Sequence, residues 1–342
     1  MAKLAVVLFN LGGPDRVESI RPFLFNLFND PAIITAPGPI RWLLAQYISR
    51  KRAPVAAEIY QHLGGKSPLL DLTWDQANAL RDVLSSEHEV QTFIAMRYWH
   101  PMSDEVAYEV KDFDPDEVIL LPLYPQFSTT TVGSSIDDWN RAAKAAGLDK
   151  PTHSICCYPL QSGWIEAVTE LTRKGLQEAE SKGKPRLLFS AHGLPKKIVD
   201  AGDPYQWQVE QTSAAVVEAL GIDDLDWAVC YQSRVGRLEW IGPSTEQELQ
   251  RAGNDGVPAV IVPIAFVSEH SETLVELDIE YREEADKLGV PGYVRVPAVG
   301  THPAFIGGLA DLVGQIRTGD SPPRGTRICA ANLGQCPCGK GD

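Results

Sequence analysis

The segment FVSEHSETLVELDIEY, residues 266–281, carries five acids directly after an apolar stretch. If it forms an α-helix, each residue turns about 100°, and its four glutamates fall within about 80° of one another. Carboxylates at i,i+4 repel, so this alignment weakens an isolated helix. Two explanations remain open: a solvated charged face, or a polar path that carries cations or protons. The acids are Glu269, Glu272, Glu276, Asp278 and Glu280.

A histidine lies at the end of another apolar segment, LLFSAHGLP, where His192 is followed by Gly193. Histidine titrates near neutrality and binds borderline metals. Together with a carboxylate such as Glu272, it would form a pair for proton transfer or metal handling. Two ligands are too few for a tight structural site, so a metal held there would be in transit or incompletely coordinated. The alternative is a histidine that only caps a loop.

The first half of the chain suits a large flat ligand that carries carboxylates. Aromatic and hydroxyl side chains occur with one arginine in RYWHP, YPQFSTTTVGSS and HLGGKSP. These segments offer Arg97, Tyr98 and Trp99, then Tyr124, Phe127, Ser128 and Thr129 to Thr131, and finally Gly64, Gly65 and Ser67. The glycine pairs do not have the spacing of dinucleotide or phosphate-loop fingerprints, which disfavours a nicotinamide enzyme. The alternative for these pairs is that they are simple turns.

Residues 38–52 predict an amphipathic helix that ends in a basic run. Its apolar residues recur at helical spacing: Ile40, Leu43, Leu44, Tyr47 and Ile48. The helix either packs on its own domain or forms an exposed apolar lip. Such a lip would touch a membrane or grip a hydrophobic ligand.

The tail RICAANLGQCPCGKGD has a C-x6-C-x-C spacing formed by Cys329, Cys336 and Cys338. Three thiols so close in sequence are typical of a metal or cluster site, which needs a fourth ligand. Cys156 and Cys157 are the candidates, and in a strand only one of the two would point the right way. Structural zinc and unliganded thiols are the alternatives.

Strands and helices must position all of these residues. Near-continuous apolar runs alternate with helical patterns, which predicts an α/β fold with buried parallel strands. Polar residues follow each run, at the carboxyl ends of strands, where such folds bind ligands. We expect two doubly wound domains, residues 1–155 and 156–315, with a cleft between them. Residues 316–342 form a cysteine-bearing tail.

Composition limits the function classes. The 342 residues carry a net charge of −14, which argues against a nucleic-acid partner. The N-terminus lacks a signal-peptide pattern, and no window reaches the length of a transmembrane helix. We therefore expect a cytoplasmic protein whose six cysteines stay reduced.

Several motifs in order together resemble the ferrochelatase family. They are NLGGP, GGKSP, RYWHP, YPQFSTTTVGSS, FSAHGLP, YQSRVG, EWIGP and FVSEHSETLVELDIEY. The resemblance implies a chelatase-like fold of two Rossmann-like domains, each with a parallel four-stranded sheet. It implies a lyase of haem biosynthesis that inserts the substrate Fe2+ into protoporphyrin IX and releases two protons.

The resemblance also implies roles for individual residues. His192 and Glu272 would bind the metal and handle protons, and Glu269, Glu276, Asp278 and Glu280 would continue the polar path. The porphyrin would be framed by Leu11, Ser67, Arg97, Tyr98, Thr130, Trp240 and His270.

Some family members hold a C-terminal [2Fe–2S] cluster, and the cysteine tail resembles their ligand set. Animal members take a fourth cysteine from the YPQ loop, where this chain has Thr129. Cys157 or Cys156 is the inferred substitute. Peripheral membrane contact and a homodimer stay open. So do a chelatase for coproporphyrin or cobalt, a non-catalytic haem- or metal-binding protein, and a redox protein built around the tail.

Overall fold

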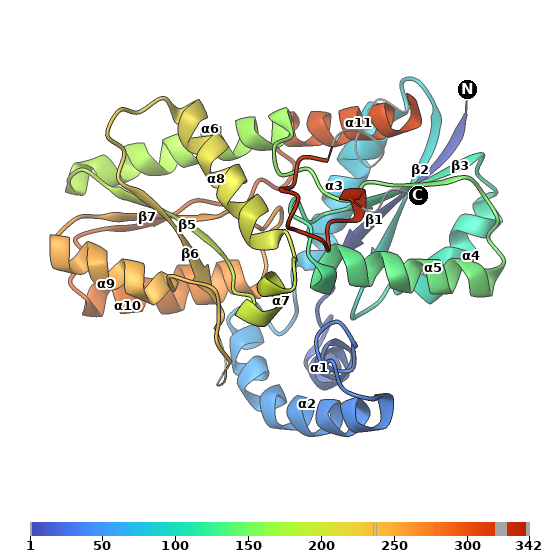
Figure 1. The fold of residues 1–342 in the computed structure, drawn as a ribbon, viewed down its shortest axis with the longest axis horizontal. Coiled ribbons are helices and arrows are strands. Elements are labelled where there is room, and N and C mark those ends of the chain that lie inside the picture. The colour runs from blue at the N-terminus through green and yellow to red at the C-terminus, as the bar shows by residue number, and fades with distance from the viewer. Residues whose placement is uncertain (1, 235, 237, 319–326, 340–342) are drawn as a thin grey trace. The chain divides into compact units, whose positions relative to one another are not determined.

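The computed structural model describes residues 2–234, 236, 238–318 and 327–339 (Figure 1). Contacts group the chain into two compact units. Unit 1 consists of Met1–Cys157 and Ala310–Thr326, and unit 2 of Tyr158–Leu309 and Arg327–Asp342. Each unit is built on one four-stranded parallel sheet, so the predicted α/β class is confirmed.

The sheet of unit 1 has the strand order β2-β1-β3-β4. β1 (Lys3–Asn10) pairs with β2 (Glu89–Met96) on one side and β3 (Glu117–Pro122) on the other, and β4 (Thr152–Ser154) forms an edge. Residues 4–9 of β1 are at most 1% exposed. Helices cover both faces of the sheet, which explains the uninterrupted apolar run.

The helices of unit 1 include α4 and α5 on one face of the sheet and α3 on the other (Figure 1). A short π-helical turn, η2, leads directly into α5. The bounds are α1 (Ile20–Phe28), α2 (Gly38–Gln61), α3 (Leu69–Leu84), α4 (Ser103–Phe113), η2 (Thr129–Gly133) and α5 (Ser134–Ala146).

The predicted helix at residues 38–52 is the first part of α2, which continues past Pro54 to Gln61. It contacts α1, and its small residues Ala53, Ala56 and Ala57 pack against the cluster that contains Phe23 and Leu24 of α1. The opposite face is open: Leu43 is 62% and Tyr47 65% exposed. Packing of the apolar face on its own domain is therefore the wrong alternative, because the small-residue face makes that contact.

The sheet of unit 2 has the order β6-β5-β7-β8. α6 and α8 cover one face, and α9 and α10 cover the other (Figure 1). The strands are β5 (Arg186–His192), β6 (Trp227–Gln232), β7 (Ala259–Pro263) and β8 (Tyr293–Arg295). The helices are α6 (Ser162–Ala179), α7 (Lys196–Asp200), α8 (Tyr205–Leu220), α9 (Thr245–Asp255) and α10 (Tyr281–Lys287). The last helix, α11 (Pro303–Thr318), begins in unit 2 and ends in unit 1.

The acidic segment is not a regular α-helix, and this part of the prediction was wrong. A π-helix, η4, runs over Glu272–Glu280 and continues into α10. Its i→i+5 hydrogen bonds widen each turn, a form that is rare and frequent at functional sites. Glu269 lies before the helix, so it does not share a helical face with the other glutamates.

Two glycine-rich turns of unit 1 touch. A Cβ added at Gly13 would lie 2.5 Å from both Cβ and Oγ of Ser67. The amide of Ser67 also donates to the carbonyl of Pro14 at 2.8 Å. The turn after β1 and the turn before α3 are thus held together by a contact that only glycine allows.

No helix of the described ranges is long and apolar enough to cross a membrane.

Candidate active site

His192 ends β5, and the chain turns sharply behind it. A Cβ added at Gly193 would lie 2.9 Å from the carbonyl oxygen of Gln232, so the turn requires glycine. His192 Nδ1 lies 2.8 Å from Glu272 Oε2, from the first turn of η4. The His192 side chain is 45% exposed and that of Glu272 22%. The two predicted partners therefore meet at the carboxyl edge of the unit 2 sheet, with the ring still open to solvent.

Each member of this pair favours the charged form of the other. Desolvation disfavours the imidazolium, but the Glu272 carboxylate outweighs it and raises the pKa of His192. Burial likewise disfavours the Glu272 carboxylate, and His192 outweighs it and lowers the pKa of Glu272. The pair is an ion pair at neutral pH, and Nδ1 is the ring nitrogen that the carboxylate engages.

A second carboxylate is held beside the pair by Ser233, the residue after β6. The Ser233 amide donates to Glu276 Oε1 at 2.8 Å, and its hydroxyl donates to Oε2 at 2.5 Å. Ser233 Oγ also lies 3.4 Å from Glu272 Oε2. Burial first, and then the charge of Glu272, raise the pKa of Glu276 to about 7. Glu276 can therefore take up and release a proton near neutral pH.

The backbone of Ser233 is left-handed, with φ of 60°. A non-glycine residue in this region carries strain, which persists only where its surroundings impose it. Here the conformation aims both the amide and the hydroxyl at one carboxylate.

The other acids of the predicted path have different partners. Arg295 pairs with Glu269 at 2.9 Å and with Asp278 at 3.2 Å. Asp278 also accepts a hydrogen bond from Arg282 at 2.7 Å. Glu280 is exposed. The structure thus brings Glu276 to the His192 pair, and it places Glu269 and Asp278 on cations instead.

His270 and Trp240 are the predicted porphyrin neighbours in unit 2. His270 is buried, and desolvation lowers its pKa, so its ring is neutral. Its Nε2 and the Nε1 of Trp240 are buried and have no hydrogen-bond partner among the described residues. Trp240 also lies close to Gly193, because a Cβ added at Gly193 would be 3.3 Å from the indole ring. Buried polar atoms left in this state are candidates for contact with a substrate or water.

In unit 1, Arg97 and Tyr98 are both tied to Asp30, a residue that sequence reasoning missed. Arg97 Nη2 lies 2.9 Å from Asp30 Oδ2, and the Tyr98 hydroxyl donates to the same oxygen at 2.8 Å. Ser134 donates to it as well, and also accepts from Arg97 Nε at 2.7 Å. Asp138 lies 3.8 Å from Arg97. The guanidinium is therefore largely neutralised within the unit.

The remaining candidates of unit 1 lie in turns at strand or helix ends. Ser67 is 6% exposed, and its hydroxyl accepts from the Leu69 amide at the start of α3. Thr130 is 8% exposed and contacts the hydroxyl of Ser128 at 2.9 Å. Leu11 follows β1 and is half-buried among aromatic residues.

The thiols of the tail gather around Trp207 of α8. Gln208 donates to Cys329 Sγ at 3.1 Å. Hydrogen bonds from Cys329 and then Cys338 lower the pKa of the Cys336 thiol, which favours the thiolate that metals bind. Cys156 and Cys157 belong to unit 1, with their sulfurs 3.3 Å apart. In the described part of the chain, no three His, Cys, Asp or Glu side chains are arranged to hold a metal ion. The donor chemistry suits a cluster, but the ligand set is incomplete.

The chain is similar to known proteins over most of its length. A family model described as ferrochelatase matches residues 3–316. The chain belongs to the ferrochelatase family. The ferrochelatase of Caulobacter vibrioides is 54% identical over 346 residues, which covers 99% of this chain and 98% of the relative. That of Pelagibacter ubique is 49% identical, with 98% of both chains covered.

A third ferrochelatase, from Wolbachia pipientis wMel, is 55% identical and covers 91% of this chain and 98% of its own. Among solved structures, SirB from Bacillus subtilis with Fe3+ has a TM-score of 0.53 at 13% identity. That match covers 92% of this chain and 95% of SirB, and it shows the fold alone. The resemblance inferred from the motifs is confirmed.

Several site residues of this ferrochelatase-family chain escaped sequence reasoning. Ser233 lay within a quoted motif, at a strand end, where its position could have drawn attention. Asp30 gave no comparable signal, because its partners Arg97, Tyr98 and Ser134 are distant in sequence and its own neighbours are ordinary.

Proposed function

We propose that this chain is a ferrochelatase, a lyase that inserts Fe2+ into protoporphyrin IX to form protohaem with release of two protons. One observation carries the proposal: the His192–Glu272 pair, 2.8 Å apart, lies at the carboxyl end of a parallel sheet with Glu276 attached through Ser233. A binding protein would not need a second carboxyl that titrates near neutral pH beside an ion pair.

The chemistry explains why bases are needed. Metal insertion exchanges two pyrrole protons for one Fe2+, which is here a substrate. His192, oriented through Nδ1 by Glu272, presents its other nitrogen to the ring. Because His192 is protonated at neutral pH, it first passes that proton to Glu276, whose pKa is raised to about 7. The neutral ring then accepts a pyrrole proton, and the Glu272 carboxylate stabilises the imidazolium that forms.

We assign the polar-path residues Glu269, Asp278 and Glu280 a role outside the proton transfer at His192. Glu269 receives a hydrogen bond from Thr273 at 2.5 Å, and the amide of His270 donates to that threonine at 2.9 Å. Glu269 therefore helps to hold the start of η4.

Porphyrin contacts are proposed for Leu11, Ser67, Arg97, Tyr98, Thr130, Trp240 and His270. The aromatic and apolar members suit the flat ring, and the unpaired Nε2 of His270 suits a polar atom of the ligand. Because Asp30 neutralises Arg97, we infer that Arg97 mainly fixes the loop that carries Tyr98.

The proposal is tested by an anaerobic visible-absorption time course with ferrous iron and protoporphyrin, with coproporphyrin in parallel. We expect collapse of the free-base bands over many turnovers, faster with protoporphyrin. Faster conversion of coproporphyrin would name it as the natural acceptor. Bands that shift only to a stoichiometric limit would mean a binding protein.

Substitution of His192 sharpens the test. His192→Ala removes the group proposed to accept the proton, so kcat should fall by about 10²-fold or more. His153→Ala is the control, because this partly exposed histidine lies in β4 of unit 1 and its contact with Glu117 is a long one of 3.9 Å. Near-full activity of purified His192→Ala would refute the assignment.

We further propose a [2Fe–2S] cluster held by Cys329, Cys336, Cys338 and Cys157 (or Cys156). Support comes from the gathered thiols and the lowered pKa of Cys336. Iron and acid-labile sulfide in anaerobically purified protein should fall in Cys338→Ser. They should be unchanged in Cys230→Ser, since Cys230 is buried in the sheet of unit 2. Equal iron and sulfide in both variants would contradict the ligand set.

The proposed location is the cytoplasm, with peripheral membrane contact through the open face of α2. A measurement of mass in solution tests whether the chain forms a homodimer.

A further inference from the structure

A hydroxyl continues the hydrogen bonds of the active site beyond Glu276. Tyr281 begins α10 directly after η4. Its hydroxyl lies 3.3 Å from Glu276 Oε1 and 3.0 Å from Glu246 Oε1. Glu246 lies in the first turn of α9 and is exposed. An unbroken series of contacts no longer than 3.4 Å therefore runs from His192 through Glu272, Ser233, Glu276 and Tyr281 to solvent at Glu246.

We propose that Tyr281 and Glu246 form the route by which protons leave the active site, branching away from the acidic helix at Glu276. The inference rests on the proposed function, since metal insertion is what releases the protons. In this proposal Tyr281 contacts Glu276 and Glu246, and neither Tyr281 nor Glu246 contacts the substrate. Both act through Glu276, so they are relay residues rather than catalytic ones.

The alternative route along the helix is blocked at Asp278. This carboxylate is bound by Arg282 and Arg295 at 2.7 and 3.2 Å. Burial disfavours its charge, but the two arginines outweigh burial and hold the pKa of Asp278 below its ordinary value. A group that must accept a proton to pass it on is poorly served by two fixed cations.

The surroundings of Tyr281 suit proton transfer through a neutral hydroxyl. Burial first, and then the charges of Glu276 and Glu246, raise the pKa of Tyr281 far above neutrality. Protonated Glu276 gives its proton to Tyr281 Oη while the phenolic proton moves to Glu246, so the tyrosine ends as it began. The buried thiol of Cys230 also faces this ring, and burial raises its pKa to about 12, so it stays uncharged.

The last residue of the route is placed to release the proton. Glu246 lies at the N-terminal end of α9, where the helix dipole stabilises a carboxylate. A proton that reaches it is therefore passed to water.

The test is Tyr281→Phe, which removes only the hydroxyl and keeps the ring in the core shared by η4, α9 and the sheet. Tyr293→Phe is the matched control, because Tyr293 lies in the same core and donates to the carbonyl of Leu277 instead. We expect kcat of Tyr281→Phe to fall about tenfold. KM for iron and porphyrin should not change, and the solvent deuterium isotope effect on kcat should rise.

A second variant avoids the core altogether. Glu246→Gln at the surface should show the same fall in kcat and the same rise in isotope effect. Added imidazole buffer should partly restore its rate, since a soluble base replaces the lost carboxylate. Glu283→Gln, an exposed acid of α10, is its control.

The results distinguish failure of the relay from failure of the proposed function. If Tyr281→Phe matches Tyr293→Phe, or loses activity with an unchanged isotope effect, the relay is refuted while the proposed function stands. If the unaltered chain binds porphyrin without repeated turnover, the proposed function fails first and the relay fails with it.

Discussion

Glu272 lies between His192 and Glu276, and its charge raises the pKa of both. Toward the imidazole the effect is attraction between opposite charges, and toward the carboxyl it is repulsion between like charges. Burial opposes the first effect and adds to the second. One carboxylate thus prepares two neighbours to hold protons near neutral pH, which is the condition for passing protons in sequence.

This arrangement predicts that the protonation of Glu276 makes the stability of the protein depend on pH. Its pKa is raised from 4.5 to about 7 in the folded state, so the native protein binds more protons than the unfolded chain between these values. Stability should therefore fall as pH rises through this window. Glu276→Gln removes this titrating group, so the stability of the variant relative to the unaltered chain should rise by about 2 kcal/mol between pH 5 and pH 8.

Urea unfolding at several pH values measures this difference. Glu283→Gln, which replaces an exposed acid, should show no such trend. A stability difference between Glu276→Gln and the unaltered chain that is flat with pH would contradict the assignment.

Single residues could be predicted where their position in the chain already implied their neighbours. His192 and Glu272 follow buried strands, so both had to lie at one edge of a parallel sheet. Arg295 could not be predicted as the partner of Glu269 and Asp278, because nothing in the sequence links residues so separated. The acidic stripe consequently looked uniform, although its members have different counter-ions.

Among the elements, the π-helix η4 and the turn after β6 together define the site. The period of the acids, one every four residues, fits both an α-helix and a π-helix, so the sequence could not distinguish them. The turn after β6 contributes through the left-handed backbone of Ser233, which was equally hidden because serine rarely adopts it.

That turn gives a prediction in which stability and activity diverge. Ser233→Gly and Ser233→Ala both remove the hydroxyl that binds Glu276, so both should lower kcat by similar factors. Only glycine relieves the left-handed backbone, so Ser233→Gly should be about 1 kcal/mol more stable than Ser233→Ala. Thermal unfolding and steady-state rates, measured on the same preparations, test both halves. Equal stability of the two variants would show that the backbone is not strained.

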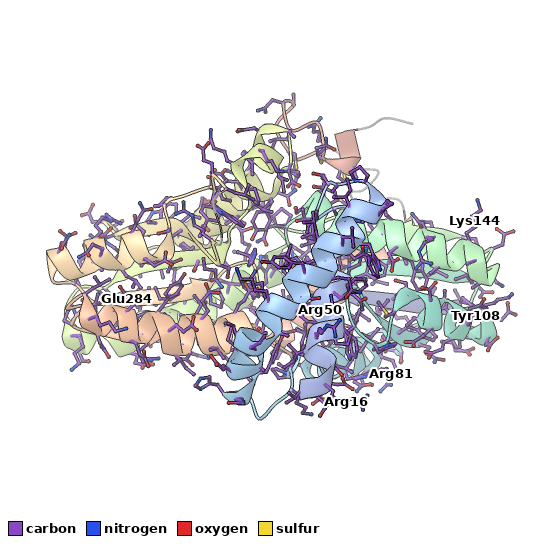
Figure 2. All side chains as sticks on the ribbon, turned by 90° about the horizontal axis from the view of Figure 1, so that it is seen from below. Arg16, Arg50, Arg81, Tyr108, Lys144 and Glu284 are labelled. Atoms are coloured by element: carbon purple, nitrogen blue, oxygen red, sulfur yellow. The ribbon has the colours of Figure 1, made fainter. Side chains whose placement is uncertain are left out.

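For the molecule as a whole, the alternation of strands and helices was enough to predict two parallel sheets. Burial on both faces leaves a strong apolar signature in every central strand. The open face of α2 was predicted only as one of two alternatives, because periodicity shows that a face is apolar but not what covers it. Figure 2 looks onto this helix, with Arg50 near its middle.

A chain with net charge −14 should bind membranes through this face rather than through overall charge. Leu43→Ser and Tyr47→Ser should each lower partition onto lipid vesicles by about tenfold, because each removes a side chain worth ~1.5–3 kcal/mol when buried. Val83→Ser, on α3 and 47% exposed, is the control. Vesicle co-sedimentation with equal binding by all variants would rule out α2 as the contact.

The contact between Gly13 and Ser67 means that the residue allowed at one of these positions depends on the residue at the other. Alanine at position 13 would demand that position 67 lose its side chain, because the added carbon and the serine would occupy the same space. Gly13→Ala should not survive alone in a randomised library, whereas Gly13→Ala together with Ser67→Gly would restore the spacing. A double-mutant library at these two sites would therefore return correlated pairs instead of independent preferences.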